Sequence, residues 1–210
     1  MKRALIIIGP TAVGKTDLAF SLSRAFSSVL ISADSIQVYR GADIISGKDK
    51  LHPTFLLDIV PPNEPFSVRD FVERVRPIVH QAFEEDKIPI IVGGTGFYID
   101  ALFGKIDTIN IPPDLELRKK LKDFSVDQLQ NKLREHDSIR FQKMNNSDVK
   151  NKRRLIRAIE ISRSKRNKVE PVFDTKEVLF IGLMTSMENL RKRIAVRVEQ
   201  RLEVGALAEA

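Results

Sequence analysis

A glycine-rich segment near the amino terminus has the composition and spacing of a phosphate-binding loop. The glycines would let the backbone wrap so that successive N–H groups point at phosphate oxygens, and a following helix would add its positive end. The segment fits the pattern G-x-x-x-x-G-K-T/S and consists of Gly9, Pro10, Thr11, Ala12, Val13, Gly14, Lys15 and Thr16. Lys15 would add a positive charge, and the Thr16 hydroxyl could bind Mg²⁺ between phosphate oxygens. The pattern predicts a site for a Mg²⁺-bound diphosphate group without saying which molecule carries it.

Two other polar groups follow apolar runs that read as buried strands. Asp34 comes shortly after residues 29–31, and Thr95 lies among the glycines that follow residues 88–92. Ligands of open α/β sheets bind at the carboxyl ends of the strands, so we expect both side chains beside the phosphate loop. A carboxylate there could accept a proton from an attacking nucleophile or bind Mg²⁺ through water. The alternatives stay open that Asp34 only caps a turn and that the glycines only form a strand-to-helix turn.

Apolar residues alternate along the chain between strand-like runs and helical stripes. Strands are predicted over residues 3–8, 29–31, 88–92 and 178–183, and helices over residues 17–26, 67–85, 97–103 and 187–202. The longest of the early helices should have Ser67 as its N-cap and should end or kink at Pro77. Strands that alternate with helices favour an α/β fold, here a P-loop NTPase-like parallel sheet flanked by helices.

The pattern changes in the middle of the chain, where no strand is convincing. Short amphipathic stretches over residues 115–121, 126–133 and 148–163 predict a helical insertion. We therefore divide the chain into residues 1–111 as the first part of the P-loop core, 112–171 as a basic helical insertion, and 172–210 as the return to the core.

The charge of the chain is unevenly distributed. The net charge is +7, yet residues 1–115 carry 12 basic and 14 acidic side chains, whereas residues 116–210 carry 23 basic and 14 acidic ones. Eleven of the basic residues lie between Arg140 and Lys168. Such a concentration suggests a polyanionic partner, RNA or DNA before a membrane, although a solvated lysine-rich surface would look the same.

Composition excludes several classes of protein. The chain of 210 residues has no cysteine, which rules out a disulfide scaffold, a thiolate metal site and a cysteine nucleophile. Its three histidines are scattered, which makes a histidine-built metal centre improbable. No apolar run approaches the roughly 20 residues of a membrane span, and no signal peptide is evident. We expect a cytoplasmic protein that does not contact membranes, and a monomer.

Taken together, these segments make the sequence resemble the tRNA dimethylallyltransferases, also called tRNA isopentenyltransferases. The matching segments are residues 9–16, residues 34–41 with Asp43 and Ile44, residues 57–59, residues 92–98, residues 153–160, and Arg193 and Ile194 with Arg197. The phosphate loop is shared by many enzymes, whereas the D-S-x-Q-x-Y and G-G-T-G-x-Y segments together are quite specific. Family members are usually longer and end in another basic helical region, which this chain is expected to lack.

The resemblance implies transfer of a dimethylallyl group from its diphosphate to N6 of the adenosine next to the anticodon on its 3′ side. By position, Asp34 matches the general base, and Thr95 a threonine that supports the reacting centre and the tRNA. The loop at residues 9–16 and Arg197 would hold the donor's diphosphate with Mg²⁺, which Thr16 would bind. The tRNA contacts implied are Asp34, Ser35, Ile36, Gln37 and Thr95 around the flipped adenine, and Arg153, Arg154, Leu155, Ile156 and Arg157 on a helix.

Two alternatives of other kinds remain at this point. A P-loop kinase for a small molecule or nucleoside would hold ATP at residues 9–16 and use Asp34 to activate a hydroxyl. The long, strongly basic insertion argues against it, because kinase lids are usually short. A non-catalytic RNA-binding protein would keep the loop only as a remnant.

Overall fold

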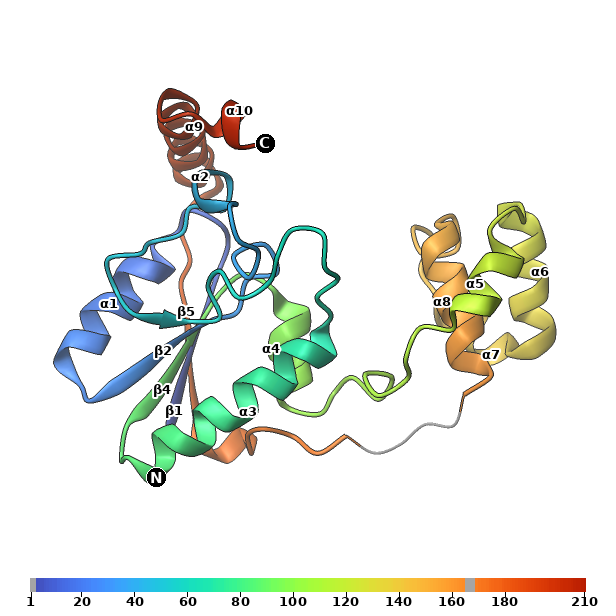
Figure 1. Cartoon of the computed structure of the whole chain (residues 1–210), viewed down its shortest axis with the longest axis horizontal. Helices are drawn as coiled ribbons and strands as arrows, with labels where there is room; N and C mark the ends of the chain where they lie inside the picture. Colours follow the sequence, from blue (N-terminus) through green and yellow to red (C-terminus); the bar gives the residue numbers. More distant parts are fainter. Residues whose placement is uncertain (1–2, 165–168) are drawn as a thin grey trace. The chain divides into compact units, whose positions relative to one another are not determined.

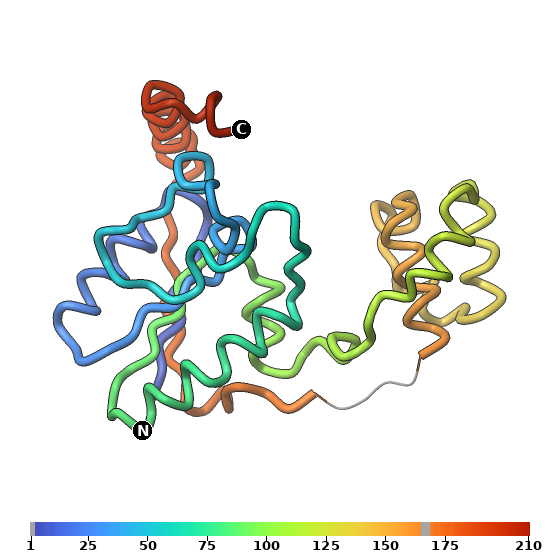
Figure 2. Tube along the Cα trace, in the orientation of Figure 1, coloured from blue at the N-terminus to red at the C-terminus, as the bar shows by residue number. Residues whose placement is uncertain are grey.

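The computed structural model describes residues 3–164 and 169–210, which form two compact units. The core unit is Met1–Lys105 with Glu170–Ala210, and the insertion unit is Ile106–Val169. Figure 2 follows the chain as it leaves the core unit after its first part and returns to it for the last part. Lys165, Arg166 and Lys168, which belong to the basic segment noted above, lie outside the described residues.

The core unit is built on a five-stranded parallel sheet, which confirms the predicted α/β class (Figure 1). Its order is β3-β2-β4-β1-β5, with β1 Ala4–Ile8, β2 Ser28–Ser32, β3 Thr54–Phe55, β4 Ile88–Val92 and β5 Val178–Gly182. Ile91 of β4 lies opposite Ile6 of β1 and Ile31 of β2, and all three side chains are fully buried. Strands covered on both faces explain why these runs are almost wholly apolar.

Helices cover both faces of this sheet. Those of the core unit are α1 Lys15–Ala25, α2 Asp43–Ser46, α3 Val68–Glu84, α4 Gly96–Leu102, α9 Met187–Glu203 and α10 Ala206–Glu209, with a 3-10 turn, η1, at Thr175–Glu177. Ala19 and Phe20 of α1 pack on one face with Ile7, Ile90 and Val92. Figure 1 shows α3 and α4 on the opposite face. The candidate site lies at the carboxyl ends of the strands, where residues of α2 and α9 help to line it.

In helix α3, tertiary packing outweighs the local tendency of a proline to end a helix. Ser67 is its N-cap, as predicted, and Asp70 completes a capping box. Pro77, however, lies inside the helix and does not end it. The apolar stripe on both sides of Pro77, including Phe71 and Val79, is buried against the sheet, and that burial outweighs one missing backbone hydrogen bond.

Over its described residues, the insertion unit has four helices around a small apolar core. They are α5 Leu115–Leu121, α6 Val126–His136, α7 Ser138–Lys143 and α8 Lys152–Ser162. The core includes Leu121, Leu129, Leu133 and Leu155, each at most 2% exposed. Sequence periodicity missed α7, because a helix this short has no buried residue and starts directly at the Asp137 cap that ends α6.

No helix in the described part of the chain combines the length and the apolar character needed to cross a membrane.

Candidate active site at the carboxyl edge of the sheet

The phosphate loop lies between β1 and α1, in the strand–loop–helix context that its sequence predicts. Gly14 adopts a left-handed φ of 102° at the N-cap of α1, and no side chain caps this helix. The first N–H groups of α1 are therefore available to an anion. Gly9 passes so close to the neighbouring chain that a Cβ there would lie 2.6 Å from the Leu183 carbonyl oxygen.

Lys15 is the first residue of α1, and its Nζ folds back over the loop. It donates hydrogen bonds to the carbonyl oxygens of Gly9 at 2.9 Å and Pro10 at 2.8 Å. Burial lowers the pKa of Lys15, and the positive charge of Arg197 lowers it further, whereas Asp34 acts in the opposite direction. Two cations held this close repel each other, and an anion bound between them would relieve that repulsion.

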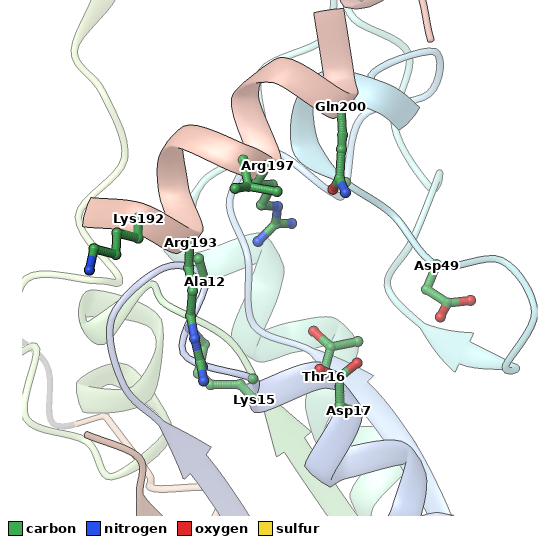
Figure 3. A pocket seen from close by; sticks show the side chains of 12 residues that line it. Ala12, Lys15, Thr16, Asp17, Asp49, Lys192, Arg193, Arg197 and Gln200 are labelled. Atoms are coloured by element: carbon green, nitrogen blue, oxygen red, sulfur yellow. The ribbon is translucent and has the colours of Figure 1, made fainter. Parts of the chain in front are cut away.

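A cavity of about 750 Å³, the α9 cavity, separates the loop from helix α9. Figure 3 shows Arg193 and Arg197 extending from α9 toward the side that holds Ala12 and Lys15. The Arg193 guanidinium donates to the Val13 carbonyl oxygen at 3.3 Å, which links α9 to the loop. The side chains around the cavity carry four positive charges, from Lys15, Lys192, Arg193 and Arg197, against two negative ones, from Asp17 and Asp49. The cavity therefore has the charge to bind a compact polyanion.

Asp34 stands at the end of β2 and is half-buried. Its Oδ1 accepts hydrogen bonds from the backbone N–H groups of Ile36 at 2.9 Å and Gln37 at 3.4 Å, which fixes the carboxylate in a turn. Its Oδ2 has no hydrogen-bond partner among the described residues and is free to accept one from a ligand. The turn-capping alternative is thus part of the geometry, but it occupies only one of the two oxygens.

The Asp34 carboxylate lines a second cavity of about 240 Å³, the Asp34 cavity. This cavity adjoins the α9 cavity, because the same five residues line both: Ala12, Lys15, Thr16, Asp49 and Arg197. A group bound between the phosphate loop and α9 would therefore lie next to a second molecule that approaches Asp34.

The strand ends bring the other predicted residues to the same edge. The Thr95 hydroxyl oxygen accepts a hydrogen bond from the Ser35 N–H at 3.2 Å, which joins the end of β4 to the residue after Asp34. Gly93 lies against the Ala33 carbonyl oxygen, where no Cβ would fit. Half-exposed Ile36 lines the Asp34 cavity together with Gln37. Thr95 itself does not line that cavity, so its contact with the site runs through Ser35.

The chain fits a metal that arrives with its ligand better than one held by the protein alone. Among the described residues, no three histidine, aspartate or glutamate side chains gather to hold an ion. The Thr16 hydroxyl and the Asp34 carboxylate do line one cavity, and Mg²⁺ prefers such oxygen ligands while it keeps several waters and phosphate oxygens.

Sequence reasoning assigned no site role to several residues of these cavities. Lys192, Arg193, Gln200 and Asp49 line the α9 cavity, and Arg201 lines the Asp34 cavity. The spacing of Arg193, Arg197 and Arg201 was the available signal, because residues four apart lie on one face of a helix.

The five residues predicted to contact tRNA on α8 have different surroundings in the insertion unit. Arg153 is exposed, and exposed Arg154 pairs with Asp148. Leu155 is fully buried, so its side chain could contact RNA only if the core opened, whereas Ile156 packs against the same core and stays partly exposed. Arg157 is half-buried and hydrogen-bonded to protein groups.

Arg157 belongs to a cluster around Glu160, whose side chain is fully buried. The carboxylate accepts hydrogen bonds from Arg118 at 2.6 and 3.1 Å, from Arg157 at 3.0 Å and from the Asp114 N–H at 3.0 Å. Arg157 also donates to the Ile111 carbonyl oxygen at 2.7 Å. Burial raises the pKa of Glu160, but the hydrogen bonds from Arg118 and Arg157 outweigh it and leave the pKa below its ordinary value.

Comparison with known proteins agrees with this geometry over the whole chain. A family profile described as IPP transferase matches residues 37–210, and one described as isopentenyl transferase matches residues 2–53. A tRNA dimethylallyltransferase of Syntrophus aciditrophicus is 37% identical over 100% of this chain and 71% of its own length.

Solved structures give the same answer. The structure of a eukaryotic dimethylallyltransferase acting on tRNA matches with a TM-score of 0.82 and 27% identity, over 100% of this chain and 55% of that one. The tRNA isopentenylpyrophosphate transferase of Bacillus halodurans matches with a TM-score of 0.65 and 34% identity, over 99% of this chain and 69% of its own. These findings do not favour the kinase or the non-catalytic alternative. The chain belongs to the IPP transferase family of tRNA dimethylallyltransferases.

Proposed function

We propose that this chain transfers a dimethylallyl group from dimethylallyl diphosphate to N6 of the adenosine 3′-adjacent to the anticodon of tRNA, with release of diphosphate. The observation that carries the proposal is the junction of the two cavities. The cation-lined α9 cavity and the Asp34 cavity share Lys15, Thr16 and Arg197. A donor diphosphate and an acceptor base would meet there.

The acceptor half of the reaction needs a base. The lone pair of an exocyclic adenine amine is delocalised into the ring, so N6 is a poor nucleophile. As the N6–C1 bond forms, the amine must lose a proton, and Asp34 Oδ2 is free to accept it. The base must also leave its stack to enter the cavity, which costs a few kcal/mol. Contacts between the basic insertion and the RNA backbone would offset that cost.

The donor half needs a site for the leaving group. The bond between C1 and the diphosphate oxygen breaks, and both electrons of that bond leave with the diphosphate. Lys15, Arg193 and Arg197 line the cavity that would receive this charge. A preorganised contact of this kind lowers a barrier by about 3 kcal/mol. Thr16, with Asp34 through water, would hold Mg²⁺, which neutralises part of the same charge when it is bound.

The proposal also covers the setting of the reaction. We expect the chain to act as a monomer in the cytoplasm with Mg²⁺ bound to the donor. Sedimentation of the purified chain, with and without tRNA, measures its oligomeric state, and removal of Mg²⁺ by EDTA should abolish transfer.

The decisive experiment replaces the base. The chain is incubated with dimethylallyl diphosphate, Mg²⁺ and unmodified tRNA, and the digested nucleosides are weighed. Asp34→Asn keeps an oxygen for the Ile36 N–H but cannot accept a proton, so transfer should fall by about 10²- to 10⁴-fold while pyrophosphate binding persists. Adenosine that gains no prenyl mass with the unaltered chain, with ATP consumed on a small hydroxyl acceptor instead, would favour the kinase.

A further inference from the structure

Helix α2 lies over the Asp34 cavity and begins without a cap of its own. Its N-cap residue is Ala42, whose side chain cannot accept a hydrogen bond. The missing acceptor comes from the far end of the chain. Glu209 of α10 accepts from the Ile44 N–H through Oε2 at 2.7 Å and from the Ile45 N–H through Oε1 at 3.1 Å. One carboxylate therefore satisfies two N–H groups of the first turn of α2.

Helix α9 holds the same segment from a second side. The Arg201 guanidinium donates to the Ile45 carbonyl oxygen at 2.8 Å. Gly47, with a left-handed φ of 63°, passes so close to the guanidinium groups of Arg197 and Arg201 that a Cβ there would collide with both. The segment after α2 is thus set directly against two arginines that line the Asp34 cavity.

Ion pairs around the Lys48 side chain hold this segment from another side. The Lys48 side chain is fully buried and donates to Asp43 Oδ1 at 3.0 Å, and it also contacts Asp58 and the Tyr39 carbonyl oxygen. Hydrogen bonds from Lys50 and Lys48 lower the pKa of Asp43. The Lys48 pair joins the residue at the start of α2 to a residue just after its end, and the Glu209 contact then sets how the first turn of α2 lies against the cavity.

Gln37 connects this segment to Asp34. The Gln37 side-chain amide donates to the carbonyl oxygens of Ser46 and Gly47, each at 3.4 Å, and its oxygen accepts from the Ser32 hydroxyl at 2.7 Å. Gln37 lines the Asp34 cavity, and its backbone N–H binds the Asp34 carboxylate. A shift of α2 would therefore turn the amide beside the candidate base.

We propose that Glu209 is a positioning residue for the acceptor side of the site: by capping α2 it sets the wall of the Asp34 cavity that receives the adenine. The inference rests on the proposed function, because it names the acceptor. It also predicts that the two substrates respond differently, since Ile45 and Ser46 of α2 line the Asp34 cavity, whereas the α9 cavity is lined only by Gly47 and Asp49 of the segment after α2. Loss of Glu209 should weaken use of the RNA and leave use of the donor unchanged.

The test compares three variants in steady-state transfer to an anticodon stem-loop RNA. Glu209→Ala should lower kcat/KM for the RNA by about tenfold, with KM for dimethylallyl diphosphate within about twofold of the original. Glu209→Gln keeps one acceptor oxygen for the two N–H groups and should lie in between. Glu203→Ala is the matched control, because Glu203 is an exposed carboxylate at the end of α9 and lines neither cavity.

Hydrogen exchange gives a readout that does not depend on turnover. In Glu209→Ala, the amides of Ile44 and Ile45 should exchange faster, while those of α1 keep their rates. Faster exchange without the split between RNA and donor parameters would overturn the positioning role, as would equal losses for both substrates. If the unaltered chain itself transfers no dimethylallyl group, the proposed function fails. If the unaltered chain is active and Glu209→Ala is too, only this inference fails.

Discussion

Helices α8 and α9 both carry arginines at close spacing, but the structure uses them differently. On α8, Arg154 pairs with Asp148, and Arg157 pairs with buried Glu160. On α9, Arg193 and Arg197 line a cavity and form no ion pair with any residue in the described ranges. Cations that the chain neutralises itself stabilise its fold, whereas cations left beside a cavity remain available to an anionic ligand. Whether an arginine has an acidic partner within the chain therefore indicates, better than its place in a basic helix, whether it stabilises the fold or can bind a ligand.

Among changes on α8 and α9, the largest effect should come from Arg197, the unpaired arginine that lines both cavities. Under the proposed function Arg197 would donate to the leaving group, so Arg197→Ala should lower kcat/KM for transfer by about 100-fold. Arg191→Ala is the control, since Arg191 is exposed on the same helix and lines neither cavity. Equal losses in the two variants would show that α9 acts only through its overall charge.

A smaller effect, on stability, should follow from weakening the ion pairs between Glu160 and its two arginines. Glu160→Gln weakens the charged hydrogen bonds from Arg118 and Arg157, so the free energy of unfolding of the insertion unit should fall by about 2 kcal/mol. Hydrogen exchange of the α8 amides measures this loss. Glu116→Gln, at an exposed pair with Lys119 on α5, should leave it unchanged.

The pH dependence of the stability of the insertion unit tests the same cluster independently. Because the pKa of Glu160 in the folded unit lies below its ordinary value of 4.5, the carboxylate contributes stability in full above that value. This contribution should be lost as the pH falls below 4.5 through the folded-state pKa, and Glu160→Gln should remove that part of the acid sensitivity. The same acid profile in both proteins would mean that the cluster contributes little.

The smallest effect should be a difference in tRNA binding between variants of two neighbouring arginines on α8. Arg153 is exposed and Arg154 is held by Asp148, so Arg153→Ala should weaken tRNA binding by a few-fold and lower its salt slope by about 1. Arg154→Ala should change both quantities less. Filter binding of tRNA at several salt concentrations measures them, and the reverse ranking would refute the rule drawn from the comparison of α8 and α9.

Much of the fold could be predicted from local patterns. Four of the five strands, the N-cap at Ser67 and the helix over residues 187–202 agree with the structure within a few residues. The missed strand β3 has only two residues, too few to show a period. The outcome at Pro77 could not be read locally either, because burial of the whole stripe of α3 decides it.

The sequence by itself determined the phosphate loop, its place between a strand and a helix, and Asp34 at the end of the next strand. These follow from local geometry, since a glycine pattern and an apolar run act on their own neighbours. Only the tertiary structure decided which cations remain free. The pair of Arg118 and Glu160 joins residues far apart in the chain, and the closer pairs of Arg154 and Arg157 form only because the fold brings an acidic side chain within reach. The tertiary structure also decided that Glu209 caps α2, since that contact depends on how the end of the chain packs on the sheet edge.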